Sequence, residues 1–193
     1  MTNRRISTTF FAIAYGVGIL AAWLAGNWIS QVARQGEGVS SALYLTIPLI
    51  QVFVLVVLLT FIYKTWKAIQ DGHASTSPAA AAWLLLIPIF HLYWIFRATW
   101  GFAKDYNKFI ERHGFDVERL PDGLYLITSV IICIKCAYLT LGTILPLISD
   151  KIALLGPSST YVLTIPATVF ILIMIIKSGT AINSLPEIEK VEE

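Results

Sequence analysis

The stretch "PAAAAWLLLIPIFHLYWIFRATWGF", residues 78–102, decides how many times this chain crosses a membrane. It is apolar and longer than the roughly 20 residues that a membrane-spanning helix needs. Pro88 and His91 lie near its middle, and a proline removes a helix hydrogen bond and clashes with the preceding turn. The stretch is therefore either a proline-kinked span or a re-entrant segment that enters and leaves by the same face.

The rest of the sequence is typical of an integral membrane protein. Its residues are 56% hydrophobic and 13% charged, whereas about 25% are charged in a soluble domain. The first apolar run follows Arg4 and Arg5 and is too long for a signal peptide, so we expect it to be retained as a span. We predict an all-α helical bundle, a single membrane domain over residues 1–193, with four spans at about 9–31, 42–63, 124–148 and 160–176.

The lysines and arginines favour the re-entrant interpretation of residues 78–102, because basic residues collect in cytoplasmic loops. If residues 78–102 cross the membrane and the N-terminus is cytoplasmic, most of the lysines and arginines lie outside. A returning segment leaves only Arg34 and Lys151 outside. The cytoplasmic set is then Arg4, Arg5, Lys64, Lys67, Arg97, Lys104, Lys108, Arg112, Arg119, Lys177 and Lys190. We predict four spans plus one re-entrant or kinked segment, with the N-terminus cytoplasmic; five transmembrane helices are the alternative.

Residues 102–113 have the pattern of an amphipathic helix. Apolar side chains recur on one face, namely Phe102, Tyr106, Phe109 and Ile110. The other face is charged and mostly basic. We expect this segment to lie as an interfacial surface helix along an anionic cytoplasmic leaflet; the alternative is a solvated connecting helix.

A lysine interrupts the apolar run "IICIKCAYL", residues 131–139. Lys135 lies about eleven residues from either end of its predicted span, near the bilayer centre, where a lysine costs about 2.5–3.5 kcal/mol. No Asp or Glu occurs in any predicted span, so its partner must be dipoles, water or an anionic ligand. One interpretation is that its amine caps carbonyls freed by Pro88, around residues 86–90, or contacts His91. The other is that it binds an anionic headgroup or substrate, or carries a proton.

The sequence gives little support for catalysis or for a cofactor. Redox Cys-x-x-Cys pairs work at helix N-termini, but Cys133 and Cys136 lie in the middle of a span. With His91 they would supply three metal ligands at best. The sequence has no phosphate-binding glycine loop, metalloprotease motif or serine-nucleophile elbow. A net charge of +2 is too small to indicate nucleic-acid binding. We expect no enzyme activity, no cofactor and no metal site.

The run "LLIPIFHLYWIFRATWGFAKDYNKF", residues 85–109, resembles a pattern in bacterial multi-pass inner-membrane proteins that carry a domain of unknown function. The matching residues are Ile87, Pro88, Tyr93, Trp94, Trp100, Gly101, Lys104, Asp105 and Asn107. His91 stands where that pattern has asparagine. The resemblance implies a bacterial inner-membrane protein with several spans, and it brings no activity with it.

Two candidate sites follow. The first contacts lipid or a partner protein through Trp94, Arg97, Trp100, Lys104, Asp105 and Asn107. Arg97 is expected to stack on a neighbouring indole or bind a lipid phosphate; an aromatic belt is the simpler alternative. The second is an intramembrane polar site of Lys135, His91 and Pro88. We expect a non-enzymatic membrane component that binds anionic lipid or a partner protein, with a second copy of itself or a larger membrane complex as the protein partner. A small transporter or channel is the alternative, and a membrane enzyme has the least support.

Overall fold

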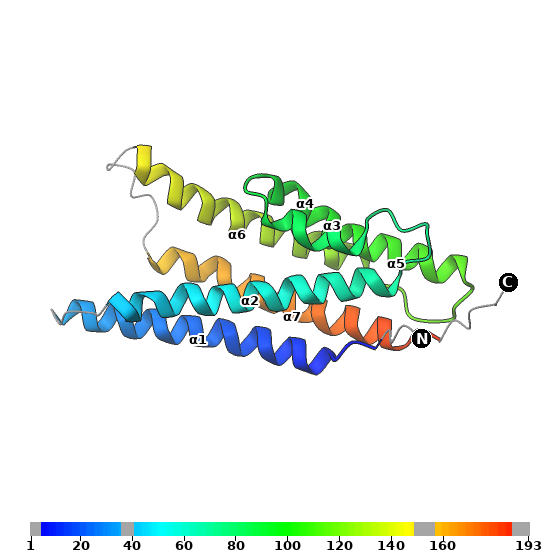
Figure 1. Cartoon of the computed structure of the whole chain (residues 1–193), viewed down its shortest axis with the longest axis horizontal. Helices are drawn as coiled ribbons and strands as arrows, with labels where there is room; N and C mark the ends of the chain where they lie inside the picture. Colours follow the sequence, from blue (N-terminus) through cyan, green and yellow to red (C-terminus); the bar gives the residue numbers. More distant parts are fainter. Residues whose placement is uncertain (1–4, 36–40, 149–156, 187–193) are drawn as a thin grey trace.

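Four long helices form the body of the protein (Figure 1). The computed structural model describes residues 5–35, 41–148 and 157–186, and every regular element within these ranges is helical. The long helices are α1 (Thr8–Arg34), α2 (Ser41–Ala68), α6 (Asp122–Ile148) and α7 (Pro157–Asn183). Each contains a stretch long and apolar enough to cross a membrane: Thr8–Arg34, Leu45–Ala68, Asp122–Leu141 and Leu163–Asn183. The prediction of an all-α bundle with four such helices is confirmed.

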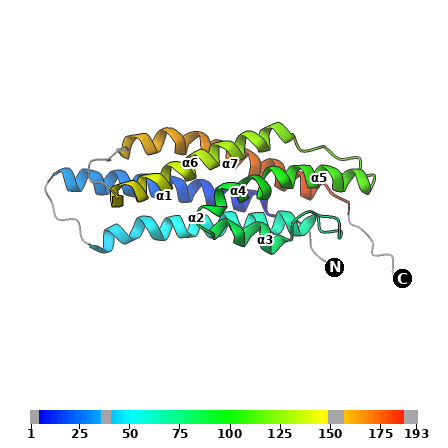
Figure 2. The same ribbon diagram turned by 90° about the horizontal axis from the view of Figure 1, so that it is seen from above.

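Residues 78–102 do not form one helix. They contain α3 (Pro78–Trp83), a 3-10 turn η1 (Leu84–Leu86), a reversal at residues 87–89, and α4 (Phe90–Ala98). The two limbs lie side by side, because the Trp94 indole Nε1–H donates to the Ala80 carbonyl oxygen at 3.0 Å. The segment is thus a helical hairpin whose two ends lie at the same end of the bundle (Figure 2). It is not a continuous kinked rod.

The hairpin completes a ring of helices. α2 packs on α1, α1 on α7 and α7 on α6, while α3 packs on α2 and α4 packs on α6. Two hydrogen bonds fix the outgoing limb. The Trp66 indole Nε1–H donates to the Ala98 carbonyl oxygen at 3.0 Å, and the Thr99 and Ser129 hydroxyls lie 2.5 Å apart. The limb is therefore held between α2 and α6.

The densest packing lies at the end of the bundle where α1 begins and α7 ends. We call α5 (Trp100–Arg112) and the loops 69–77 and 113–121, which lie at this end, the head. The large side chains that are fully buried here include Trp66, Tyr106, Phe109, Tyr125, Ile175 and Ile182. On α6, by contrast, no side chain from residue 131 to residue 141 is buried. The described part of α6 is therefore closely packed near the head and less closely packed from residue 131 to residue 141.

The position of α5 corrects one prediction. The helix is amphipathic as expected, but it begins at Trp100 and its apolar face is covered by protein. Phe102, Tyr106, Phe109 and Ile110 are each no more than 3% exposed. In both views α5 runs along the bundle rather than across its end (Figures 1 and 2). The prediction that this face lies on a leaflet is wrong, because the ends of α2, α6 and α7 already bury it.

Candidate functional site

Arg97 is used inside the protein. Its Nε–H donates to the Thr76 hydroxyl at 3.2 Å, and its Nη2 donates to the Ser75 carbonyl oxygen at 3.2 Å. Within the described residues its guanidinium stacks on neither Trp94 nor Trp100. The side chain ties α4 to loop 69–77, so it closes the base of the hairpin rather than standing free for a lipid phosphate.

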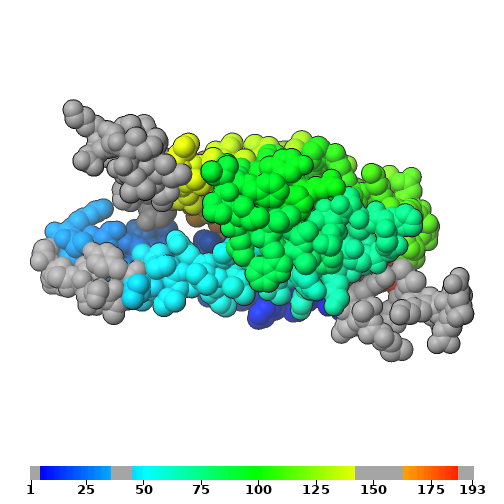
Figure 3. Space-filling view, turned by 45° about the horizontal axis from the view of Figure 1, so that its top comes forward, coloured from blue at the N-terminus to red at the C-terminus, as the bar shows by residue number. Residues whose placement is uncertain are grey.

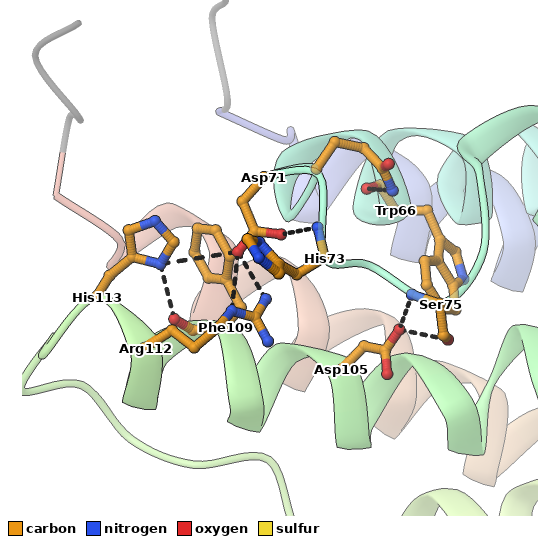
Figure 4. A network of polar contacts seen from close by, with 9 residues as sticks. Trp66, Asp71, His73, Ser75, Asp105, Phe109, Arg112 and His113 are labelled. Atoms are coloured by element: carbon orange, nitrogen blue, oxygen red, sulfur yellow. Dashed lines mark hydrogen bonds and ion pairs between the residues drawn. The ribbon is translucent and has the colours of Figure 1, made fainter. Parts of the chain in front are cut away.

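Asp105 on α5 holds the same loop (Figure 4). Its Oδ2 accepts the Ser75 backbone N–H at 2.7 Å and the Ser75 hydroxyl at 2.5 Å. Asp105 as a whole is only 9% exposed, and a buried charge of this kind needs such hydrogen bonds to offset its desolvation. Together with Trp94 and Arg97, Asp105 fixes the geometry of the hairpin.

Asn107 closes the second loop of the head. Its amide nitrogen donates to the Leu120 carbonyl oxygen at 2.8 Å and its Oδ1 accepts the Leu120 N–H at 2.8 Å. The same nitrogen donates to Asp122 Oδ1 at 3.0 Å. Three of the predicted polar contact residues, Arg97, Asp105 and Asn107, are therefore occupied by the protein itself.

Lys104 and Trp100 remain at the surface. The Lys104 amine lies 3.3 Å from the centre of the Trp100 ring, a cation–π contact that leaves the hydrogen-bond donors of the amine available. Lys108 is exposed one turn further along α5, on the same face. We call Trp100, Lys104 and Lys108 the α5 stripe.

A polar network that the sequence did not indicate surrounds Asp71 (Figure 4). Arg112 donates to Asp71 Oδ2 through Nε at 3.1 Å and through Nη2 at 2.6 Å. The His73 N–H donates to Oδ1 at 2.9 Å, and His113 Nδ1 lies 4.0 Å from Oδ2. Burial alone would raise the pKa of Asp71, but the Arg112 and His73 hydrogen bonds and the Arg112 charge bring it below its ordinary value. The network joins loop 69–77 to the last turn of α5.

The hairpin tip is the second predicted site. Pro88 lies at the reversal, and the Phe90 N–H donates to the Pro88 carbonyl oxygen at 2.7 Å. Ile89 between them has φ 66° and ψ −49°. These values define a classic γ-turn, which is rare and strained for a β-branched residue. His91 Nδ1 lies 3.3 Å from the Ile87 carbonyl oxygen. The histidine satisfies a carbonyl of its own turn.

Lys135 is half-buried on α6. Its amine makes no hydrogen bond or ion pair with any residue that the structure describes. The expectation that it caps the carbonyls of residues 86–90 or contacts His91 is therefore wrong for the described structure. Cys133 and Cys136 on either side are half-buried free thiols. No three His, Cys, Asp or Glu side chains among the described residues are placed to hold a metal ion.

Neither a protein-family model, nor a curated protein, nor a solved structure matches this chain. The resemblance of residues 85–109 to bacterial inner-membrane proteins therefore stays a prediction.

Proposed function

We propose that this is a non-enzymatic integral membrane protein that binds anionic lipid at its cytoplasmic face, with the hairpin re-entering the bilayer from that face. The observation that carries the proposal is the composition of the hairpin tip. Turns exposed to water are rich in Gly, Pro, Asn, Asp and Ser, and of these the tip has only Pro88. Here every residue from 86 to 90 is exposed and apolar, and Ile89 is 70% exposed. Such a tip is suited to hydrocarbon and not to water.

The dimensions of the hairpin fit partial insertion. Ile89 lies eight residues before Arg97, and at about 1.5 Å per residue this is a depth of about 12 Å. The hydrocarbon core is about 30 Å thick, so the tip would end short of its centre. Irregular backbone survives in hydrocarbon only where protein covers it or its polar groups are satisfied. Pro88 has no N–H, and the N–H groups of Phe90 and His91 are both bonded.

The distribution of charge supports a cytoplasmic head. Within the described residues, the basic side chains at the head end are Arg5, Lys64, Lys67, Arg97, Lys104, Lys108, Arg112, Arg119 and Lys177. At the opposite end of the described bundle, Arg34 is the one basic residue. The positive-inside rule associates the end that is rich in lysine and arginine, here the head, with the cytoplasm.

The α5 stripe is the best candidate for lipid contact. Its two lysines form no ion pair with a described residue, in contrast to Arg112 and Lys177. Basic residues near an anionic surface each contribute about 1 kcal/mol of attraction. The Trp100 indole beside Lys104 is the side chain that membrane interfaces favour. The stripe therefore combines charge with an interfacial anchor.

The test is retention of lipid by the purified protein. We expect native mass spectrometry to find phosphatidylglycerol on the wild type, several-fold less on Lys104→Gln/Lys108→Gln, and no difference for phosphatidylcholine. Arg119→Gln is the matched control, because Arg119 is 68% exposed in the head and its partner Glu111 is 4.0 Å away. Equal retention of the anionic lipid by the double variant would reject the proposal.

A small transporter or channel is the second candidate, and the observation in its favour is that the Lys135 amine has no partner in the described part of the chain. This function requires a flux of protons or small anions across the membrane of vesicles that contain the protein. That flux should disappear in Lys135→Met. Absence of flux in the wild type removes this candidate.

A further inference from the structure

Lys135 lies on the bundle-facing side of α6. It follows Thr128 by two helical turns and Ile132 by one, and residues at this spacing share one face. Thr128 is fully buried, and Ile132 packs against the core. The lysine is therefore on the face that points toward the other helices, not on the outer face of α6.

This face of α6 is less covered by protein beyond Ser129. The hairpin separates α2 from α6 as far as its tip and then ends. Figure 3 shows a hollow between α2 and α6 past that point, with α1 and α7 behind it. The absence of buried side chains on α6 from residue 131 to residue 141 agrees with the hollow.

The depth of Lys135 follows from its distance to a fixed contact. The Tyr125 hydroxyl lies 2.5 Å from Ser178 Oγ, where antiparallel α6 and α7 meet. Moving ten residues away from this contact and from the head leads to Lys135 on α6 and to Thr168 on α7, which are therefore at the same level. Lys135 lies about 15 Å from the Tyr125–Ser178 contact along the bundle. The Thr168 hydroxyl donates to its own helix, to the Thr164 carbonyl oxygen at 2.8 Å. No acidic residue lies in α1, α2 or α7, or in α6 beyond Asp122.

We propose that this hollow binds a fatty acid, with its carboxyl group on the Lys135 amine and its chain along the apolar surfaces of α2 and α6. An amine in hydrocarbon needs a counter-charge or a hydrogen-bond acceptor, and the described protein supplies neither. The half of α2 beside the hollow is almost entirely apolar, with Leu45, Leu49 and Val52 all more than half exposed.

A fatty acid fits this depth better than a phospholipid. A phosphodiester is always charged, and its headgroup stays at the interface, about 15 Å from the bilayer centre. A carboxylic acid can enter hydrocarbon in its neutral form and reach the amine laterally through the opening. This site is separate from the α5 stripe and does not depend on it.

The experiment measures binding of radiolabelled oleate to the full-length protein in nanodiscs. We expect Lys135→Met to weaken binding tenfold or more, Lys135→Arg to retain it, and Lys67→Met, a cation at the head end, to leave it unchanged. Methyl oleate, which lacks the carboxylate, should not compete. Equal binding by Lys135→Met, or equal competition by methyl oleate, overturns the proposal.

A second measurement leaves Lys135 in place. In a Cys133→Ser background, oleate should slow the modification of Cys136 by a membrane-permeant maleimide, and methyl oleate should not. An unchanged rate contradicts the proposal even if Lys135→Met fails to fold. The Lys104→Gln/Lys108→Gln variant should bind oleate normally, so that failure of the α5 stripe and failure of this site can be told apart.

Discussion

Asn107 and Leu120 exchange two hydrogen bonds of 2.8 Å each, in the manner of two paired peptide groups. Asn183 and Ile6 do the same at the other side of the head, again at 2.8 Å in both directions. An asparagine amide presents the same donor and acceptor as a peptide. In each case it satisfies backbone groups of a segment that has no helix to satisfy them. Two asparagines thus fasten irregular chain to the packed end of the bundle.

Asn107→Ala should destabilise the protein by about 1–3 kcal/mol, because the Leu120 N–H and carbonyl lose their partners in a half-buried position. The measurement is thermal unfolding in mild detergent. Asn27→Ala is the matched control, since Asn27 makes one exposed bond within its own helix, to the Trp23 carbonyl oxygen at 2.8 Å. Its effect should stay below about 0.5 kcal/mol. Similar losses in both variants would contradict the role assigned to Asn107.

Asp71→Asn should reduce the dependence of stability on acid pH. The folded protein holds the pKa of Asp71 below its ordinary value of 3.8. Its carboxylate therefore contributes full stability above that value, and the contribution is lost as the pH falls through the lower folded pKa. Melting temperatures measured below about pH 5 should fall less steeply in the variant than in the wild type.

Glu118→Gln controls for the general effect of removing an acid from the head. Glu118 is 79% exposed and pairs with Lys177 at 3.2 Å, and exposed pairs of this kind contribute little. Its acid profile should match that of the wild type. If Asp71→Asn also matches the wild type, the Arg112 contact does not stabilise the fold.

Ile89→Gly should stabilise the isolated fold in detergent by about 1–3 kcal/mol. Glycine adopts positive φ without the steric cost that isoleucine bears at 66°. Ile87→Gly is the matched control, because Ile87 has φ −79° and ψ 116°, which suit a β-branched residue. We expect a higher melting temperature for the first variant and a lower one for the second. A decrease in both shows that the γ-turn at Ile89 is not strained.

Cysteines introduced at His73 and Asp116 should react with a membrane-impermeant maleimide from the same side of the membrane. Both positions are exposed, one before the hairpin and one after it. Gln35→Cys, at the far end of α1, should react only from the opposite side. The background lacks Cys133 and Cys136. Labelling of positions 73 and 116 from different sides would exclude the re-entrant arrangement.

The spans could be predicted because hydropathy and helix length are local properties. The reversal at Pro88 was indicated by the proline itself and by the distribution of lysines and arginines along the whole chain. The partners of Arg97, Asp105 and Asn107 could not be predicted, since each binds backbone from a loop distant in the sequence. The surroundings of α5 could not be predicted either. Its apolar side chains recur with helical spacing, and such a face can pack equally well on a lipid leaflet or on a helical bundle. Only the packing of α5 against α2, α6 and α7 decides between them.

The hairpin adds two helical limbs to one half of the bundle and none to the other. Embedded as we propose, the protein takes up more area in the cytoplasmic leaflet than in the opposite one. A body of this wedge shape relieves packing stress where the cytoplasmic leaflet is stretched. The protein should therefore concentrate where the membrane bulges toward the cytoplasm, independently of any ligand.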